Sequence, residues 1–250
     1  REIIGQEDAK KAIVDLWRRK LTGVGGHSQI TSLMLVGPSG VGKSQAAGLS
    51  ADWMGYEKKV IEMGKFSEGG VEEFRREVYV AIRQSQFRVF VLDEFEKAPL
   101  SVQQGALAML EEGKFVVTQQ SAGRWTRHEV NTRNALFFLT SNAAEDVVKS
   151  EMGEYQAMDE EMLRSRLATS HVSRALISRI VKVVPMGNPT RSDYSKGIDL
   201  YLSRLLEREG AKRGLTFVLT NAPAFKEALL RTYDGDSDFR RLQRQMNQIE

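Results

Sequence analysis

The chain of 250 residues contains no cysteine and only five prolines. Without thiols it can form no disulfide framework, no thiolate metal site and no cysteine nucleophile. No apolar run approaches the roughly 20 residues that a membrane-spanning helix needs, and no charged-then-apolar leader opens the sequence. The 36 basic and 33 acidic residues nearly cancel, which predicts neither a dedicated nucleic-acid surface nor a membrane anchor. We therefore expect a soluble, cytoplasmic protein without membrane insertion.

The apolar pattern alternates between short buried runs and helical periodicity. Such alternation predicts an α/β fold, in which a parallel sheet is covered by helices on both faces. A hairpin is expected over 115–118 and 124–130. The predicted buried strands lie at 33–36, 59–63, 89–92, 135–139 and 180–184, and the predicted helices at 6–21, 42–54, 71–84, 102–111, 143–150 and 159–169.

Beyond Pro185 the pattern changes to three amphipathic helices, over 194–213, 222–232 and 238–249, with a short extended piece at 216–219. We therefore expect a large α/β domain over residues 1–186 and a small helical lid domain over 187–250. Because the chain starts at Arg1 without Met and stops within a predicted helix, we expect it to be part of a longer protein, with the small domain incomplete at its C-terminus.

The most specific motif follows the strand predicted at 33–36. The spacing G-x-x-x-x-G-K-[ST] is matched by Gly37, Pro38, Ser39, Gly40, Val41, Gly42, Lys43 and Ser44. Glycines let the backbone turn tightly enough to aim N–H groups at a phosphate, and the following helix adds its positive N-terminal end. Lys43 is expected to reach the outer phosphates and the Ser44 hydroxyl to bind Mg²⁺. The motif predicts a phosphate-binding loop.

Polar residues follow two further predicted strands. Asp93 and Glu94 come directly after 89–92, at the sheet edge where ligands of open α/β sheets bind. Asp93 is expected to hold Mg²⁺ together with Ser44, and Glu94 to polarise an attacking water; the alternative is a strand end capped by solvated acids. Asn142 follows 135–139 and is expected to orient the water or touch the γ-phosphate, or to cap the next helix.

Five motifs in this order resemble the AAA+ ATPases, a branch of the P-loop NTPases, and specifically the Clp-type chaperone and unfoldase group. The matching residues are Ile3 to Gln6, Gly37 to Ser44, Asp93 to Ala98, Asn134 to Asn142 and Ser178 to Ile180. The resemblance implies that Ile4 borders the adenine and that Asn142 is the first sensor. It also implies that Arg179 is a finger reaching a neighbour's ATP and that Arg240 is a second sensor on the last helix. Taken alone, both arginines would be solvated surface charges.

The chain departs from the Clp pattern in one place. The aromatic loop with which Clp unfoldases grip polypeptide is replaced by a short connection over 64–70, whose only aromatic is Phe66. Phe66 is either a reduced grip or a core residue. The shortening, with the run 141–146, is similar to the torsins. Torsins, however, usually depart from the ordinary phosphate loop that this chain keeps at Gly42, Lys43 and Ser44.

The hairpin tip at 123–128 interleaves Arg124 and Arg127 with Trp125. This composition suits stacking on nucleic-acid bases or contact with a protein client. The expectation that we favour is an exposed turn with a half-buried Trp125.

The resemblance implies an enzyme that binds and hydrolyses Mg²⁺-ATP at the subunit interfaces of a homo-oligomeric ring, a hexamer, to remodel or unfold a protein partner. Two alternatives stay open. One is a nucleotide-controlled assembly switch without processive unfolding. The other is a DNA-directed AAA+ motor or loader, for which nucleic acid would be the partner.

Overall fold

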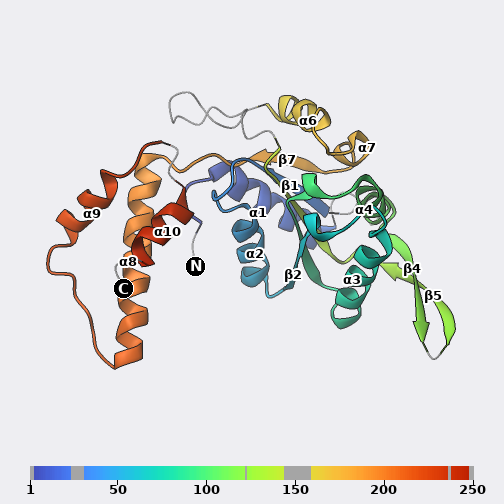
Figure 1. Cartoon of the computed structure of the whole chain (residues 1–250), viewed down its shortest axis with the longest axis horizontal. Coiled ribbons are helices and arrows are strands. Elements are labelled where there is room, and N and C mark those ends of the chain that lie inside the picture. The colour runs from blue at the N-terminus through green and yellow to red at the C-terminus, as the bar shows by residue number, and fades with distance from the viewer. Residues whose placement is uncertain (1–2, 24–30, 122, 144–158, 236–237, 248–250) are drawn as a thin grey trace.

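The computed structural model describes residues 3–23, 31–121, 123–143, 159–235 and 238–247. Its centre is a five-stranded parallel sheet in the order β2-β3-β6-β1-β7 (Figure 1). Because β6 lies between β1 and β3, the polar residues that follow these three strands meet at one edge of the sheet. The strands are β1 (Thr31–Val36), β2 (Glu57–Glu62), β3 (Arg88–Asp93), β6 (Leu136–Ser141) and β7 (Lys182–Pro185).

Helices cover both faces of this sheet, as the sequence predicted. Side chains alternate along β1, so Leu33 and Leu35 pack under α1 (Glu7–Thr22) and α2 (Lys43–Met54), while Met34 and Val36 face the opposite helices. Those opposite helices are α3 (Val71–Gln84), α4 (Leu100–Glu112), α6 (Glu160–Ala168) and the single turn α7 (Arg174–Ile177). Two short 3₁₀ turns, η1 (Met63–Lys65) and η2 (Phe95–Lys97), follow β2 and β3.

Several predicted elements differ from the observed ones. The last strand begins at Lys182 rather than at 180, and α7 was not anticipated because four residues are too few to show helical periodicity. The helix predicted over 143–150 falls on residues outside the described part of the chain, except for Ala143, which lies in a turn. The extended piece at 216–219 pairs with no strand among the described residues.

Phe66, the aromatic of the short connection after β2, is only 5% exposed. Its ring meets Phe74 of α3 edge-on, with centroids 5.6 Å apart. Of the two alternatives for this side chain, the structure therefore supports the core residue.

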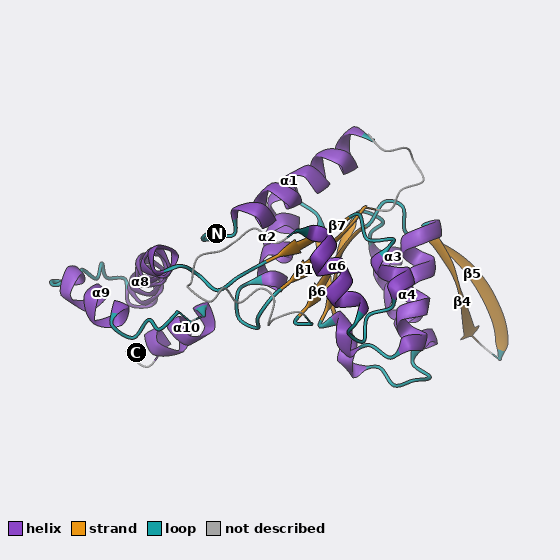
Figure 2. Ribbon diagram, turned by 90° about the horizontal axis from the view of Figure 1, so that it is seen from above, coloured by secondary structure: helices purple, strands orange, loops and turns teal. Residues whose placement is uncertain are grey.

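The hairpin consists of β4 (Lys114–Ser121) and β5 (Arg124–Asn131), which pair only with each other among the described strands. Phe115, Val117 and Val130 bury its base in the core, and both views show its distal half projecting beyond the body (Figures 1 and 2). Trp125 is 67% exposed, so the expectation of a half-buried indole was wrong. Trp125 pairs with Gln120 next to the end of the hairpin, and strand pairing alone does not bury its ring.

The helices α8 (Arg191–Arg213), α9 (Ala222–Leu230) and α10 (Phe239–Asn247) form a separate group beside the sheet (Figure 2). Thr190 and Asp193 form a capping box that starts α8. A core of their own holds the three helices together, made of Tyr194, Ile198, Leu229, Leu242 and Met246. Among the described helices, none has the length and apolarity required to cross a bilayer.

Candidate functional site

The loop between β1 and α2 is shaped by its glycines. Gly40 and Gly42 have φ values of 89° and 98°, a backbone region that disfavours residues with a Cβ. At Gly37 a Cβ would overlap the carbonyl oxygen of Met186, which lies just after β7. Gly42 serves as the N-cap of α2, so the loop leads directly into the positive end of a helix. The local geometry is that of an anion-binding turn.

Lys43 lies inside this loop and is only 8% exposed. Its Nζ donates hydrogen bonds to the carbonyl oxygens of Gly37 and Pro38, at 2.8 and 2.7 Å, and to Asn142 Oδ1 at 2.8 Å. These three acceptors are neutral dipoles, whereas an ammonium group interacts more strongly with an anion. The arrangement keeps a cation at the centre of the loop, and brings Asn142 of the β6 end to the same point.

Asp93, at the end of β3, lies next to the start of α2. Its Oδ1 accepts a hydrogen bond from Ser44 Oγ at 2.5 Å and another from the Thr140 hydroxyl at the end of β6. Thr140 Oγ1 also accepts from the backbone N–H of Glu94 at 3.0 Å. Thr140 therefore joins the two acidic residues to the neighbouring strand, a role that the sequence pattern did not assign to it.

Glu94 occupies a left-handed conformation with φ 54°, which is uncommon for a residue with a Cβ and costs conformational energy. Its Oε2 lies 2.6 Å from Lys97 Nζ in η2. The hydrogen bond from Lys97 to Glu94, together with the nearby negative charges, raises the pKa of the Lys97 amine. The left-handed turn directs Glu94 to the edge of the cavity at the end of the sheet.

Asn142 is held on both sides. Its side chain accepts from Lys43, and its backbone N–H donates to Glu96 Oε1 at 3.0 Å. The Ser141 hydroxyl accepts from the N–H of Ala143 at 3.0 Å, the contact expected of a capping side chain. The Asn142 amide therefore faces the loop, and the helix that Asn142 was alternatively expected to cap lies outside the described residues.

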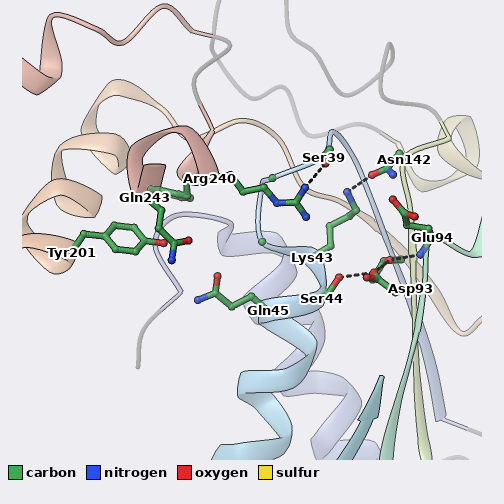
Figure 3. Close-up of a pocket in the computed structure, with 14 residues that line it drawn as sticks. Ser39, Lys43, Ser44, Gln45, Asp93, Glu94, Asn142, Tyr201, Arg240 and Gln243 are labelled. Atoms are coloured by element: carbon green, nitrogen blue, oxygen red, sulfur yellow. Dashed lines mark hydrogen bonds between the residues drawn. The ribbon is translucent and has the colours of Figure 1, made fainter. Parts of the chain in front are cut away.

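A cavity of about 190 Å³ opens beside these residues, and α10 closes one side of it (Figure 3). Arg240 reaches across from α10 and donates from Nη1 to Ser39 Oγ at 2.9 Å. The cavity thus brings together, from elements distant in sequence, most of the predicted site residues. Its lining comprises Ser39, Gly40, Gly42, Lys43, Ser44, Gln45, Asp93, Glu94, Thr140, Asn142, Tyr201, Phe239, Arg240 and Gln243.

Ile4 lies in an adjoining small cavity of about 30 Å³. The lining is more apolar than that of the larger cavity and combines Ile3, Ile4 and Val41 with residues of α8 and α10. Tyr201 and Phe239 line both cavities, so the two spaces are neighbours. An apolar slot beside a polar, cationic loop suits a ligand with a flat ring at one end and phosphates at the other.

Arg179, in contrast to the other predicted site residues, belongs neither to the loop between β1 and α2 nor to the lining of either cavity. It follows α7, is about half exposed, and forms an ion pair with Glu111 of α4 at 2.8 Å. Its guanidinium group donates to Ser178 and Glu111, and among the described residues neither partner belongs to the loop between β1 and α2.

Several lining residues were not found from the sequence. Thr140 carried a signal, because polar residues directly after a buried strand mark the ligand edge of an α/β sheet. No sequence pattern marked Tyr201, Phe239 and Gln243 as site residues. They belong to amphipathic helices whose orientation depends on how α8 and α10 pack.

The AAA domain family (Cdc48 subfamily) matches residues 28–183. Among curated relatives, the probable chaperone protein ClpB 1 of Chlorobaculum tepidum is 26% identical over 238 residues, covering 85% of this chain and 52% of that protein. The chaperone protein ClpB of Propionibacterium freudenreichii is 28% identical over 266 aligned residues, which cover 97% of this chain and 29% of that protein. This chain spans about half or less of the length of these relatives.

Among solved structures, Hsp104 in a closed state with ATPγS and FITC casein superposes with a TM-score of 0.85 at 22% identity, covering 99% of this chain and 44% of that one. The shared fold extends through the helices α8 to α10. It confirms the predicted fold class, an AAA+ P-loop NTPase sheet with helices on both faces.

Proposed function

The chain belongs to the AAA domain family (Cdc48 subfamily), and from that premise we propose that it binds and hydrolyses Mg²⁺-ATP to remodel a protein partner. The observation that carries the proposal is the meeting of Lys43, Ser44, Asp93 and Glu94 at one cavity that Arg240 closes from the other side. In this proposal residues 1–186 form the nucleotide-binding domain and 187–250 a lid.

The phosphates bind in the loop from Gly37 to Ser44. Its backbone N–H groups and the start of α2 supply fixed positive dipoles, and Lys43 exchanges its carbonyl partners for phosphate oxygens. The adenine occupies the small cavity next to Ile4 and Val41. Arg240 is hydrogen-bonded to Ser39, so its guanidinium group lies where it can pair with the phosphates and couple nucleotide binding to the position of the lid.

The residues at the loop fit Mg²⁺. Hydroxyl and carboxylate oxygens are the hard ligands that this ion takes, and the Ser44 and Asp93 oxygens lie 2.5 Å apart. When bound there, Mg²⁺ would neutralise charge on the phosphate oxygens.

Glu94 acts as the general base. It accepts a proton from the attacking water while the new bond to the γ-phosphorus forms and the bond to the bridging oxygen breaks, which yields ADP and phosphate. Asn142 orients the water or the γ-phosphate from the end of β6. Thr140 holds Asp93 and Glu94 in position through its hydrogen bonds to the Asp93 carboxylate and the Glu94 backbone N–H.

Arg179 completes the site of a neighbouring subunit in a ring. Its position outside its own cavity, on an exposed turn, supports a role in trans. An arginine supplied in trans is worth roughly 10³ to 10⁵ in rate, because it neutralises charge on the transferring phosphoryl group. We propose a hexameric ring, in line with the Clp-type resemblance.

The proposal of a protein partner follows from the relatives, which are named chaperones, and from the Hsp104 structure with casein. A second candidate is a nucleotide-controlled assembly switch. The burial of Phe66 favours it, because the short connection over 64–70 then presents no aromatic side chain to grip a client. Unfolding of a tagged model protein separates the two, since the switch would hydrolyse ATP without unfolding it.

Two variants test the chemistry. Lys43→Ala should abolish ATP binding, whereas Glu94→Gln should leave binding intact and stop turnover. Doping Arg179→Ala into the wild type should lower the rate per wild-type subunit if the site is shared between subunits. A Glu94→Gln variant that turned over ATP at the wild-type rate would remove Glu94 as the base.

A further inference from the structure

The distal half of the β4–β5 hairpin exposes an aromatic side chain that has an arginine before and after it in the sequence. Trp125 is 67% exposed, and Arg124 and Arg127 on either side of it are also exposed. Neither guanidinium group forms a hydrogen bond or ion pair with a residue in the described part of the chain. Tryptophan and arginine are the residue types that most often dominate the binding energy of interfaces.

The hairpin is held firmly by its other face. His128 stacks on Tyr79 of α3 with ring centroids 5.4 Å apart, and Val130 is buried in the core. Side chains alternate along a strand, so Trp125 and Arg127 lie on the face opposite to His128. A rigid base therefore presents these two residues to solvent, which lowers the entropy lost when a partner binds them.

The positive charge of the distal hairpin favours an acidic partner. Residues 118–128 contain two arginines and no aspartate or glutamate. The nearest acid on the hairpin is Glu129, two residues after Arg127 on the same face, and its carboxylate already pairs with Lys114 at 3.5 Å. A carboxylate-rich ligand on the face of Trp125 would pair with the Arg127 guanidinium group.

The backbone selects a polypeptide over a nucleic acid. In a two-stranded sheet each strand has one edge with unpaired N–H and C=O groups, and β4 and β5 have no third partner among the described strands. An extended peptide can pair with such an edge, whereas a nucleic acid lacks a matching backbone.

We propose that the distal hairpin binds an extended acidic segment of a polypeptide on the face that carries Trp125 and Arg127. This rests on the proposed function in that the segment belongs to the protein partner. The hairpin would supply the contact with the client that the short connection at Phe66 does not.

Fluorescence anisotropy of a labelled, unstructured peptide rich in glutamate and valine tests the surface without nucleotide. The peptide should bind, and Trp125→Ala or Arg127→Glu should each weaken binding about tenfold. The matched controls are Trp53→Ala, which removes an indole that is 57% exposed on α2, and Arg19→Glu, which makes the same charge change on α1. Both should bind like the wild type. A peptide with glutamine in place of glutamate should bind about tenfold more weakly.

Three results would overturn the proposal. The first is peptide binding that is indifferent to Trp125 and Arg127. The second is tighter Trp125-dependent binding of oligothymidylate than of the acidic peptide. The third is a Trp125→Ala variant that binds peptide normally but no longer forms oligomers in sedimentation velocity, which would make the hairpin a contact between copies.

ATP turnover is measured separately and should be unchanged in Trp125→Ala. Absent turnover in the wild type would instead count against the proposed function.

Discussion

Arg240 on α10 donates a hydrogen bond to Ser39 in the glycine-rich loop between β1 and α2 at 2.9 Å, across 201 positions of sequence. Next to it, a Cβ on Gly40 would overlap the Asp238 carboxylate, so the start of α10 and the loop are in close contact. The C-terminal helices therefore touch the site at the loop itself. Arg240 therefore lies where a ligand in the cavity can contact it.

Arg240→Ala should weaken ATP binding about tenfold, because a cation that pairs with phosphate in the bound state is lost. Arg244→Ala is the control, since Arg244 is exposed on the same helix and does not line the cavity. Titration with a fluorescent ATP analogue measures both. Equal affinities in the two variants would show that Arg240 does not contact the nucleotide.

Thr140→Val should lower ATP turnover about tenfold while nucleotide binding changes little. The substitution keeps the shape of the side chain but removes the donor to Asp93 and the acceptor for the Glu94 N–H, each worth about 1 kcal/mol. Steady-state kinetics and a nucleotide titration separate the two effects. Thr140→Ser retains the hydroxyl and should restore turnover; a Ser variant as slow as the Val variant would contradict this role.

Gln103→Leu should lower the free energy of unfolding by about 3 kcal/mol, because it leaves buried backbone groups without partners. Gln103 is 1% exposed. Its amide donates to the carbonyls of Ala98 at 3.0 Å and His171 at 2.7 Å, and its oxygen accepts from Ser173 N–H at 2.8 Å. Urea unfolding measures the change.

The control for that measurement is Gln104→Leu, which makes the same substitution at the exposed neighbouring position. It should shift the free energy of unfolding by no more than about 0.5 kcal/mol. Similar losses in both variants would mean that the bridge made by Gln103 contributes little.

The carboxylate of Glu77 on α3 should make the free energy of unfolding depend on pH in the acid range. Burial acts to raise its pKa, but hydrogen bonds and charges from Lys59 and Lys65 outweigh it, so the pKa lies below the ordinary value of 4.5. Because the pKa is lower in the folded state, Glu77 adds to the free energy of unfolding above about pH 4.5. This contribution is lost as the pH falls through the folded-state pKa. Glu77→Gln should cost about 1 kcal/mol at neutral pH, and the cost should vanish in strong acid. Urea unfolding at several pH values measures it; a cost that did not change with pH would contradict the assignment.

Much of the site was predictable because it is encoded locally. The spacing from Gly37 to Ser44 needs only the run of residues between one strand and one helix. Asp93 and Glu94 were recognisable because carboxylates directly follow a buried strand, and the carboxyl ends of parallel strands share one edge. The same local logic predicted α3 over 71–84, the bounds that the structure has.

The residues that were missed or misjudged depend on distant packing. Thr140 gains its role only because β6 lies between β1 and β3, an order that is not visible along the chain. Tyr201 and Phe239 reach the cavity through the placement of α8 and α10. Trp125 was expected to be half buried, and is exposed because the hairpin extends past the helices that could have covered it.

The sequence by itself determined the glycine-rich turn after β1, the acidic strand end and the alternation of strands and helices, because each depends on neighbours a few residues apart. Only the tertiary structure decided which side chains face one another. It places Arg240 against Ser39 and leaves Arg179 outside its own cavity beside Glu111. The physical reason is that strand order and helix docking are set by burial of apolar faces over the whole chain.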